Sequence, residues 1–307
     1  MSDNPPTYAG RPSICRNCGA LIGAGETACH VCGAPLQPMV KAIPLRERYA
    51  IGYARAILAR PYIFTIVFLV ANFFVFLLMW EASGMSSTSL WGAFPETVLL
   101  SFGAKTNYAI RFDHEWWRFV TPVFIHVNLF HLLMNVYGLW VLGPWVEKLY
   151  GSAKFVVFWI ATGVAGVVAS YLTVIPGARP GLIGSFLIKG YDGPSAGASG
   201  ALFGLIGVLF VFGLKYRREL PEGFRRAFGT GMLPVILINV AIGFALHGLI
   251  DNAAHMGGLL SGAAISAVVS YKRPGQSVRV TIAWRIAQIA GLLLVLISFF
   301  FIFKHYE

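Results

Sequence analysis

Long runs of apolar residues, separated by short polar or glycine-rich segments, dominate the chain after residue 60. A run of about 20 apolar residues can cross the hydrocarbon core of a bilayer as one helix. The pattern predicts membrane-spanning helices at residues 62–80, 128–146, 155–175, 196–214, 232–250, 252–271 and 286–303. We therefore expect an all-α, polytopic membrane protein.

The first 40 residues differ from the rest, because they are polar, rich in proline and glycine, and hold all four cysteines. The cysteines form two Cys-x-x-Cys pairs, each followed by glycine: Cys15 with Cys18, and Cys29 with Cys32. Paired thiolates at this spacing reach one tetrahedral metal ion. So small a segment has no core of its own, and the metal would supply its folding energy. A structural zinc ribbon is the favoured interpretation, and two disulfides in an oxidising compartment are the alternative.

The composition agrees with a membrane protein, since 57% of the residues are hydrophobic and only 12% are charged. Mean hydropathy is +0.68. The net charge of +11 arises from cations in the linker 41–60 and in the segments 147–154, 215–226 and 272–285. These segments fall on one side of the predicted topology, and the positive-inside rule places that side in the cytoplasm. The membrane topology therefore explains the positive net charge, and we expect no nucleic-acid partner.

Four parts follow from these patterns. Residues 1–40 form the zinc-ribbon segment, and residues 41–60 form a basic juxtamembrane linker that lies against anionic lipid. Residues 61–275 hold six helices, and residues 276–307 hold the seventh helix and the tail. The cysteines share the cytoplasmic side with the basic loops, where a reducing environment suits free thiols. The expected location is a cell membrane, which the chain crosses several times.

Polar residues in three of the predicted helices lie at a similar depth near the outer surface. Ser199 lies about one turn into the fourth, His255 lies one turn into the sixth, and His131 and Asn135 share one face of the second. Such residues are costly in lipid and are therefore functional candidates. A serine nucleophile needs a base within hydrogen-bond reach, and His255 can serve. The Asn135 amide, the His131 imidazole and the Ser199 N–H are suitable donors to an oxyanion.

Small residues surround this polar set. Gly200 and Gly204 have Gly-x-x-x-Gly spacing, as do Gly258 and Gly262. Such spacing lets two helices approach closely, and by itself it indicates no more than helix packing. Here it would bring the fourth and sixth helices together, and with them the candidate base and nucleophile.

These residues resemble a known family. The stretch Gly197-Ala198-Ser199-Gly200 with Gly204, followed by Ala254-His255 and Gly258, is similar to the rhomboid family of intramembrane serine proteases. The likeness extends over about residues 62–271 and includes further positions, namely Trp117-Arg118, His126, His131, Asn135, the segment 143–147 and Gly151. The seventh helix resembles the six-plus-one variants of that family.

The resemblance implies a Ser199/His255 catalytic dyad that needs no cofactor, with His131 and Asn135 in the oxyanion hole. It also implies structural roles near the site for Trp117, Arg118, Gly197, Gly200, Phe203 and Gly258, the first two by stabilising the first loop. In similar proteins an aromatic residue at the position of Phe203 packs on the catalytic histidine, and core packing without a catalytic role is the alternative for Phe203. Glu147 is expected to be structural. Asp251 is expected in a wet turn, without a catalytic role, and His126 is left open.

The expected activity is cleavage of membrane-protein substrates, at a helix-destabilised transmembrane segment near the outer surface. The alternative is a proteolytically inactive rhomboid-like protein that binds client transmembrane helices. A transporter would show internal repeats or broken helices around a midplane charge, and a metalloprotease would show His-Glu-x-x-His; neither pattern occurs. The zinc ribbon would recruit a cytoplasmic partner, regulate the enzyme or brace the amino terminus.

Overall fold

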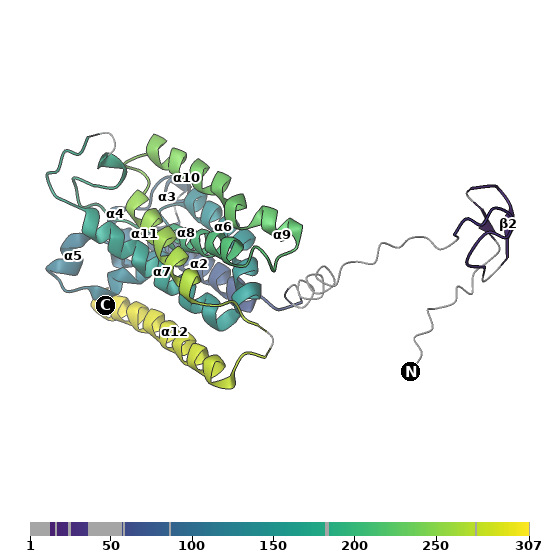
Figure 1. Cartoon of the computed structure of the whole chain (residues 1–307). Helices are drawn as coiled ribbons and strands as arrows, with labels where there is room; N and C mark the ends of the chain where they lie inside the picture. The colour runs from purple at the N-terminus through teal and green to yellow at the C-terminus, as the bar shows by residue number, and fades with distance from the viewer. Residues whose placement is uncertain are drawn as a thin grey trace. The chain divides into compact units, whose positions relative to one another are not determined.

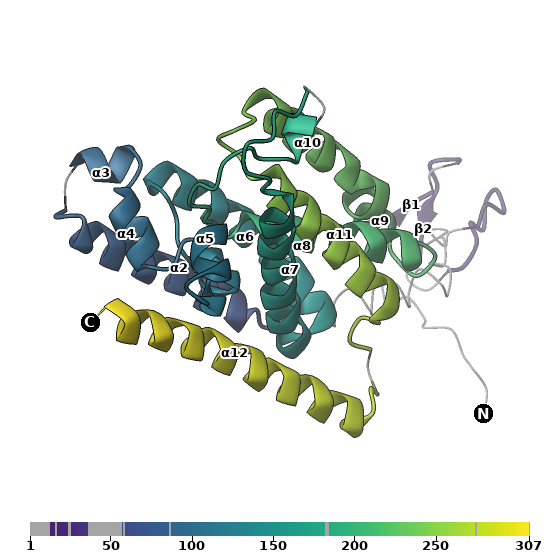
Figure 2. The same cartoon turned by 90° about the vertical axis from the view of Figure 1, so that its left-hand side faces the viewer.

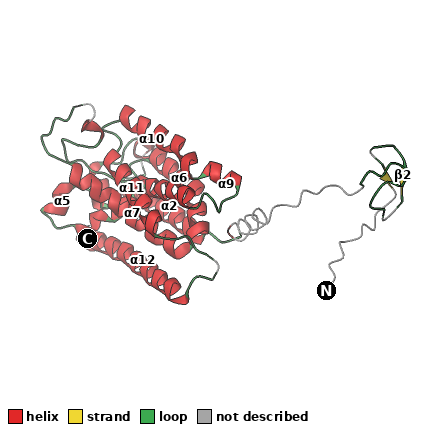
Figure 3. Cartoon of the chain, viewed as in Figure 1, coloured by secondary structure: helices red, strands yellow, loops and turns green. Residues whose placement is uncertain are grey.

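The computed structural model describes residues 13–15, 17–23, 26–35, 57, 59–85, 87–181, 184–273 and 275–306. The chain divides into two compact units, Met1–Gly52 and Tyr53–Glu307. Within the described residues, the strands lie in the first unit and the helices in the second (Figure 3). The basic linker predicted at 41–60 lies outside the described residues except for positions 57, 59 and 60.

The first unit contains a short hairpin. Strand β1 (Ser13–Ile14) pairs antiparallel with β2 (Leu21–Ile22), with Ser13 opposite Ile22. Its apolar cluster contains only Cys15, Ile22 and Cys29 as buried members. Because so little apolar surface is buried, the unit needs another source of stability.

The second unit is built from helices connected by loops and short helical turns. In chain order they are α2 (Ile63–Ala82), α3 (Ser87–Trp91), α4 (Glu96–Ser101), α5 (Asn107–Arg111), η1 (Trp116–Phe119), η2 (Thr121–Phe124), α6 (Leu129–Tyr150), α7 (Ser152–Thr173), η3 (Gly184–Phe186), α8 (Ser199–Lys215), α9 (Glu222–Ala227), η4 (Gly229–Met232), α10 (Leu233–Ala245), α11 (Asn252–Val268) and α12 (Val278–Tyr306). The first six predicted spans correspond to α2, α6, α7, α8, α10 and α11, and the seventh corresponds to α12.

Four of these helices, α2, α6, α7 and α12, are long and apolar enough to cross a membrane. The segments Ser199–Lys215 and Gly229–Ala245 are shorter apolar helices. The helix ends differ from those predicted: α10 stops at Ala245 rather than 250, and α12 begins at Val278, eight positions before 286.

Helix α8 lies at the centre of the bundle, among α6, α7 and α11 (Figures 1 and 2). Several of its apolar side chains, such as Leu205 and Phe212, are fully buried. Helices α8 and α11 approach closely, because a Cβ at Gly258 would overlap the carbonyl oxygen of Gly200. The same holds for Gly262 and the Gly204 carbonyl. The contact is backbone against backbone, so it holds the starts of the two helices at a fixed separation.

The loop between α2 and α6 is held by the far end of α12. The Trp117 ring stacks on Phe301, with centroids 5.5 Å apart and planes inclined by 6°. The buried Arg118 donates to the Ala104 carbonyl at 2.6 Å and to the Tyr306 hydroxyl at 2.7 Å, and it also pairs with Glu115. Figure 2 shows α12 along one flank of the bundle. The seventh helix is thus fastened to the first loop at its carboxyl end.

Candidate active site

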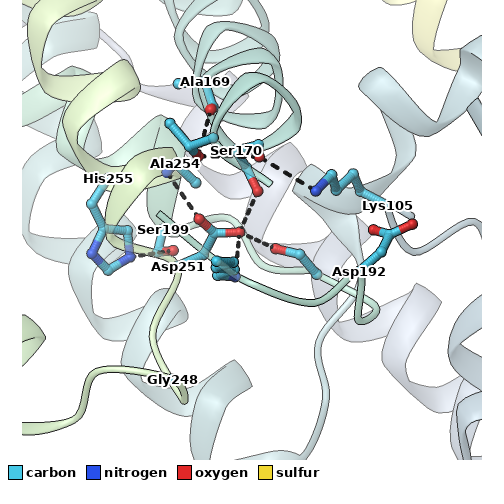
Figure 4. A network of polar contacts seen from close by, with 12 residues as sticks. Lys105, Ala169, Ser170, Asp192, Ser199, Gly248, Asp251, Ala254 and His255 are labelled. Carbon is cyan, nitrogen blue, oxygen red and sulfur yellow. Dashed lines mark hydrogen bonds and ion pairs between the residues drawn. The ribbon is translucent and has the colours of Figure 1, made fainter. Parts of the chain in front are cut away.

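A serine and a histidine from two helices meet at the starts of α8 and α11. The Ser199 Oγ and the His255 Nε2 are 2.8 Å apart, within hydrogen-bond distance (Figure 4). Both side chains are half-buried. A serine hydroxyl bonded to an imidazole nitrogen is the pair that nucleophilic catalysis requires.

Ser199 is the first residue of α8, whereas the sequence placed the helix start three positions earlier. The turn before it explains the difference, because Gly197 has a φ of +136° that a side chain would strain. A Cβ at Gly197 would also lie 2.6 Å from the Cε1 atom of His131. The backbone N–H of Ser199 therefore stands in the first turn of α8, at the positive end of the helix dipole.

The imidazole of His255 is held from one side by an aromatic ring. Phe203, one turn after Ser199, stacks on it with centroids 4.1 Å apart and planes inclined by 14°. A stacked ring restricts rotation of the imidazole while its nitrogens stay free to bond. Sequence reasoning left Phe203 between this arrangement and simple core packing, and the structure shows the ring-to-ring contact.

His131 and Asn135 come from the first turns of α6, which is capped where Asn128 accepts from the His131 N–H at 2.8 Å. The His131 ring lies against Gly197, two residues before the serine. The Asn135 amide nitrogen donates to the His131 carbonyl at 2.8 Å. Among the described residues, no hydrogen bond joins either side chain to Ser199, and the His131 Nδ1 and Asn135 Oδ1 atoms are buried without a partner.

His126 lies behind this pair. Its ring is fully buried, and it meets the His131 ring edge-on with centroids 5.2 Å apart. Neither ring nitrogen has a partner within the described part of the chain. Because it contacts His131 rather than Ser199 or His255, His126 lies behind the hydrogen-bonded pair and not in it.

Asp251, which precedes α11, is not in a wet turn as expected from the sequence, since its side chain is only 13% exposed. One carboxylate oxygen accepts from the hydroxyls of Ser170 at 2.5 Å and Ser195 at 2.6 Å, and lies 3.0 Å from the Lys189 ammonium. The other accepts from the Ala254 N–H at 3.1 Å and caps α11 (Figure 4). Three separate segments, namely α7, the loop before α8 and the start of α11, therefore meet one turn from His255.

The charge of Asp251 is favoured by this setting. Burial alone would raise the pKa of the carboxyl group, but the Lys189 ammonium and the two serine hydroxyls hold that pKa well below its ordinary range. The buried Lys105 joins the cluster by donating to the Ser170 carbonyl at 3.5 Å (Figure 4). Burial lowers the pKa of Lys105 to about 8, although the negative charge of Asp251 acts to raise it.

Sequence reasoning missed the partners of Asp251. Ser170 was a polar residue in the third span, and Lys189 was a cation on the side with fewer cations, so both carried a weak signal. Asn252 was missed as well. Its side chain is buried and donates to the Gly243 carbonyl at 2.9 Å, which joins α11 to the end of α10.

The four cysteine sulfurs of the first unit form a second cluster. All lie within 4.8 Å of one another, with Cys15 and Cys32 at 3.7 Å and Cys18 and Cys29 at 3.6 Å. The thiols are free rather than joined as disulfides. A tetrahedral ion with zinc–sulfur bonds of about 2.3 Å needs sulfurs roughly 3.8 Å apart, which these pairs match.

Comparison with known proteins gives a consistent result. A model of the rhomboid domain matches residues 113–272, just over half of the chain. Rhomboid protease GluP of Bacillus subtilis is 35% identical over 212 residues, which are 69% of this chain and 36% of that protein. Rhomboid-like protease 1 of Toxoplasma gondii is 31% identical over 201 residues, 65% of this chain and 61% of that protein. Rhomboid protease GlpG of Haemophilus influenzae is 27% identical over 157 residues, 49% and 68% of the two chains.

The matched region contains both residues of the hydrogen-bonded pair and the helices α6, α7, α8, α10 and α11 that surround it. The chain spans little more than a third of the length of GluP. With several apolar helices and a rhomboid domain over more than half of its length, this multi-pass membrane protein belongs to the rhomboid family.

Proposed function

We propose that this chain is a serine endopeptidase that cleaves transmembrane or membrane-proximal segments of other membrane proteins. The observation that carries the proposal is the 2.8 Å contact between the Ser199 Oγ and the His255 Nε2. The relatives named as rhomboid proteases support it. An inactive protein that only binds client helices would have no need for this hydrogen bond.

The reaction follows from the pair. His255 accepts the hydroxyl proton as the Ser199 oxygen attacks a substrate carbonyl, and a tetrahedral oxyanion forms. His255 returns that proton to the leaving amine as the peptide bond breaks, which leaves an acyl-enzyme. A water molecule then attacks the ester, with His255 again taking a proton. The acid product leaves and the serine regains its hydrogen. No cofactor enters these steps.

Three donors are assigned to the oxyanion: the N–H of Ser199, the His131 imidazole and the Asn135 amide. The first lies in the opening turn of α8, where the helix dipole favours negative charge. Asn135 uses one amide hydrogen on the His131 carbonyl and keeps the other. The closeness of the His131 ring to Gly197 supports its assignment. Removal of one such donor typically lowers kcat by about a hundredfold to a thousandfold.

We also infer that the site opens toward the extracytoplasmic side, with the amino terminus in the cytoplasm. Arg60 supports this orientation by donating to the Lys148 carbonyl at 3.1 Å and to the Lys272 carbonyl at 3.0 Å. Three basic segments therefore meet at one face, and the positive-inside rule makes that face cytoplasmic. Ser199 and His255 lie at the other ends of their helices.

A substrate helix must expose its backbone to Ser199, so helix-destabilising residues near the cut are expected in substrates. The 61–275 core and the 276–307 helix would carry this activity. The 1–40 segment would be a structural zinc ribbon held by Cys15, Cys18, Cys29 and Cys32, because the sulfur positions fit a tetrahedral ion. A recruiting or regulatory role toward a cytoplasmic partner is the favoured use of this segment.

Labelling of the detergent-solubilised full chain with a fluorophosphonate probe tests the dyad. Wild-type protein should be labelled, Ser199→Ala should not, and His255→Ala should lose at least about a hundredfold in rate. His247→Ala is the control, because the side chain of that exposed histidine bonds only the Phe244 carbonyl among the described residues, and its rate should stay within about twofold. Equal labelling of the Ser199→Ala protein would contradict the proposal.

A second experiment compares two transmembrane substrates of otherwise identical sequence. The first has glycine and proline near the outer end of its helix, and the second has leucine at the same positions. The wild type should cleave the first faster. If folded wild-type protein is neither labelled nor active on either substrate, the client-binding alternative is correct.

An impermeant maleimide tests both the metal and the orientation, because all four cysteines lie in the first 40 residues. Intact cells should show no modification. After lysis, modification should be slow until a zinc chelator is added, because bound thiolates are protected. Rapid modification of intact cells would place the amino terminus outside. Modification after lysis that does not depend on chelator would contradict the bound metal.

A further inference from the structure

A cavity lies on the opposite side of the helical unit from Ser199, where the starts of α7 and α12 meet the linker after α11. Its volume is about 190 Å³. Four cations line it and come from separate parts of the sequence: Arg60, Lys154, Lys272 and Arg285. Such a convergence of charge between membrane helices is what recognition of an anionic group requires.

None of these four cations forms an ion pair with a carboxylate among the described residues. The acid that lines the cavity, Glu147, is already satisfied. One of its oxygens accepts from the Phe64 N–H at 3.0 Å and the Ser152 hydroxyl at 2.7 Å. The other accepts from the N–H and the hydroxyl of Thr65, both at 2.8 Å. The cavity therefore has a surplus of positive charge that the protein itself does not balance.

Two of the cations are fixed in place by main-chain oxygens. The Lys154 ammonium donates to the Ser270 carbonyl at 2.6 Å and lies 5.5 Å from the centre of the Trp284 ring. Arg60 is held by the carbonyls of Lys148 and Lys272. Side chains that are already ordered lose little entropy when a ligand binds.

Of the four cations, Lys154 gives the strongest indication of a bound anion. It is only 4% exposed and lies in the first turn of α7, where the helix dipole is positive. A buried cation at that end of a helix is unfavourable unless an anion lies nearby. The start of α7 also has no side-chain cap, so its first amide hydrogens add to the positive potential.

A larger cavity of about 530 Å³ adjoins the first and shares Lys154, Gln276 and Trp284 with it. Its other lining residues include the exposed Val268 and Val280. The larger cavity is also lined by Arg273, so the two cavities together place cations beside apolar side chains, next to a membrane helix. This combination matches a phosphate headgroup joined to a glycerol and acyl chains. A free phosphate would use only the first cavity.

We propose that these adjoining cavities bind one anionic phospholipid, with its phosphate among the four cations and its acyl chains along α12. The lipid would come from the leaflet that faces the basic loops. The single carboxylate in the cavity, Glu147, bonds Ser152 at the start of α7 and leaves the other cations unbalanced. The lipid phosphate would supply further negative charge near Lys154 and join the start of α12 to α7. This lipid site is independent of the proposed peptidase activity.

Native mass spectrometry of the full chain in a mild detergent tests the site. Phosphatidylglycerol and phosphatidylethanolamine with identical acyl chains are titrated separately. The test variant is Lys272→Gln with Arg285→Gln, because both side chains are exposed and folding is spared. The control is Arg217→Gln with Arg225→Gln, which removes the same charge at exposed positions that do not line the cavities.

Wild-type protein should retain one phosphatidylglycerol in preference to phosphatidylethanolamine. The test variant should weaken that binding by about tenfold or more, and the control by less than about twofold. The charge-preserving pair Lys272→Arg with Arg285→Lys should bind like the wild type. Equal losses in the test and control variants would mean diffuse surface attraction and would overturn the site.

Glycerol 3-phosphate distinguishes the two sources of a phosphate group. At millimolar concentration it should leave bound phosphatidylglycerol in place. If it binds as tightly as the lipid, the ligand is a free phosphate and the lipid proposal is wrong. Melting midpoints of all variants, compared with that of the wild type, show whether a lost signal reflects lost binding or lost folding.

Discussion

Asp251 shows how much one side chain contributes to the order of this site. Its carboxylate joins α7, the loop before α8 and the start of α11, through Ser170, Ser195 and the Ala254 N–H. No hydrogen bond joins its carboxylate to the His255 ring in the described part of the chain, so it affects the Ser199–His255 pair by holding the start of α11 in place. The carboxylate bonds more strongly than a neutral amide would, because hydrogen bonds to a charged group are worth about 1.5–3 kcal/mol each.

Replacement of Asp251 by Asn should therefore lower the melting midpoint of the solubilised protein at neutral pH. The partners hold the folded-state pKa of this carboxyl below its ordinary value. Its stabilising effect is then fully present above about pH 4, the unfolded value, and declines as the pH falls further. The difference in midpoint between wild type and variant should stay constant from pH 7 to 5 and narrow below about pH 4. A gap that widens in acid would contradict this account.

Helix α8 meets α11 through backbone contact at paired glycines, whereas its other neighbours contact its apolar side chains. The Gly200 and Gly204 carbonyls lie where the Cβ atoms of residues 258 and 262 would be. The distance between Ser199 and His255 depends on this contact, because each residue lies one turn or less before it along its own helix. The packing of these two helices thus sets the distance between the Ser199 Oγ and the His255 Nε2.

Gly258→Ala should separate the two helices. A methyl group there meets a carbonyl oxygen that cannot rotate away, and overpacking of this kind costs about 1–3 kcal/mol. Both the melting midpoint and the fluorophosphonate labelling rate should fall. Gly223→Ala in α9 is the matched control, since a Cβ there has no neighbour within 4 Å. Unchanged labelling in the Gly258→Ala protein would show that the α8–α11 spacing does not set the dyad.

The sequence predicted the membrane helices and the candidate residues because both depend on local features: the length of an apolar run and the depth of a polar residue within it. It did not predict where α8 begins, because Gly197 and the His131 ring set that end. It placed Asp251 in a wet turn because the partners that enclose it are far away in the sequence. Spacing can reveal residues on one helix, and only the fold brings together residues from three segments.

On the scale of the whole molecule, α12 links the two faces. Near its start lies the cationic cavity, and at its end Tyr306 and Phe301 hold the first loop. His305 adds a contact of 2.9 Å between its Nε2 and the Glu115 carboxylate. A seventh helix that only anchored the chain would need no such polar contacts at its tip.

Phe301→Ala should therefore destabilise the protein by about 2 kcal/mol, roughly half of the cost for a fully buried phenylalanine. Limited proteolysis should then cut the first loop faster than in the wild type. Phe303→Ala is the control, because that ring is 63% exposed on the same helix. If both variants behave alike, α12 does not hold the loop.

The lengths of the outer helices have a consequence for the surrounding lipid. The apolar part of α12, residues 286–303, rises about 27 Å, and the apolar helical segment Gly229–Ala245, which contains α10, rises about 26 Å. The two helices lie on opposite flanks of the bundle (Figures 1 and 2). A hydrocarbon core of average thickness, about 30 Å, must therefore thin by a few Å at both flanks, at a cost of fractions of a kcal/mol for each Å of mismatch. That cost is smallest in thin membranes, so hydrophobic mismatch alone would sort this protein toward them.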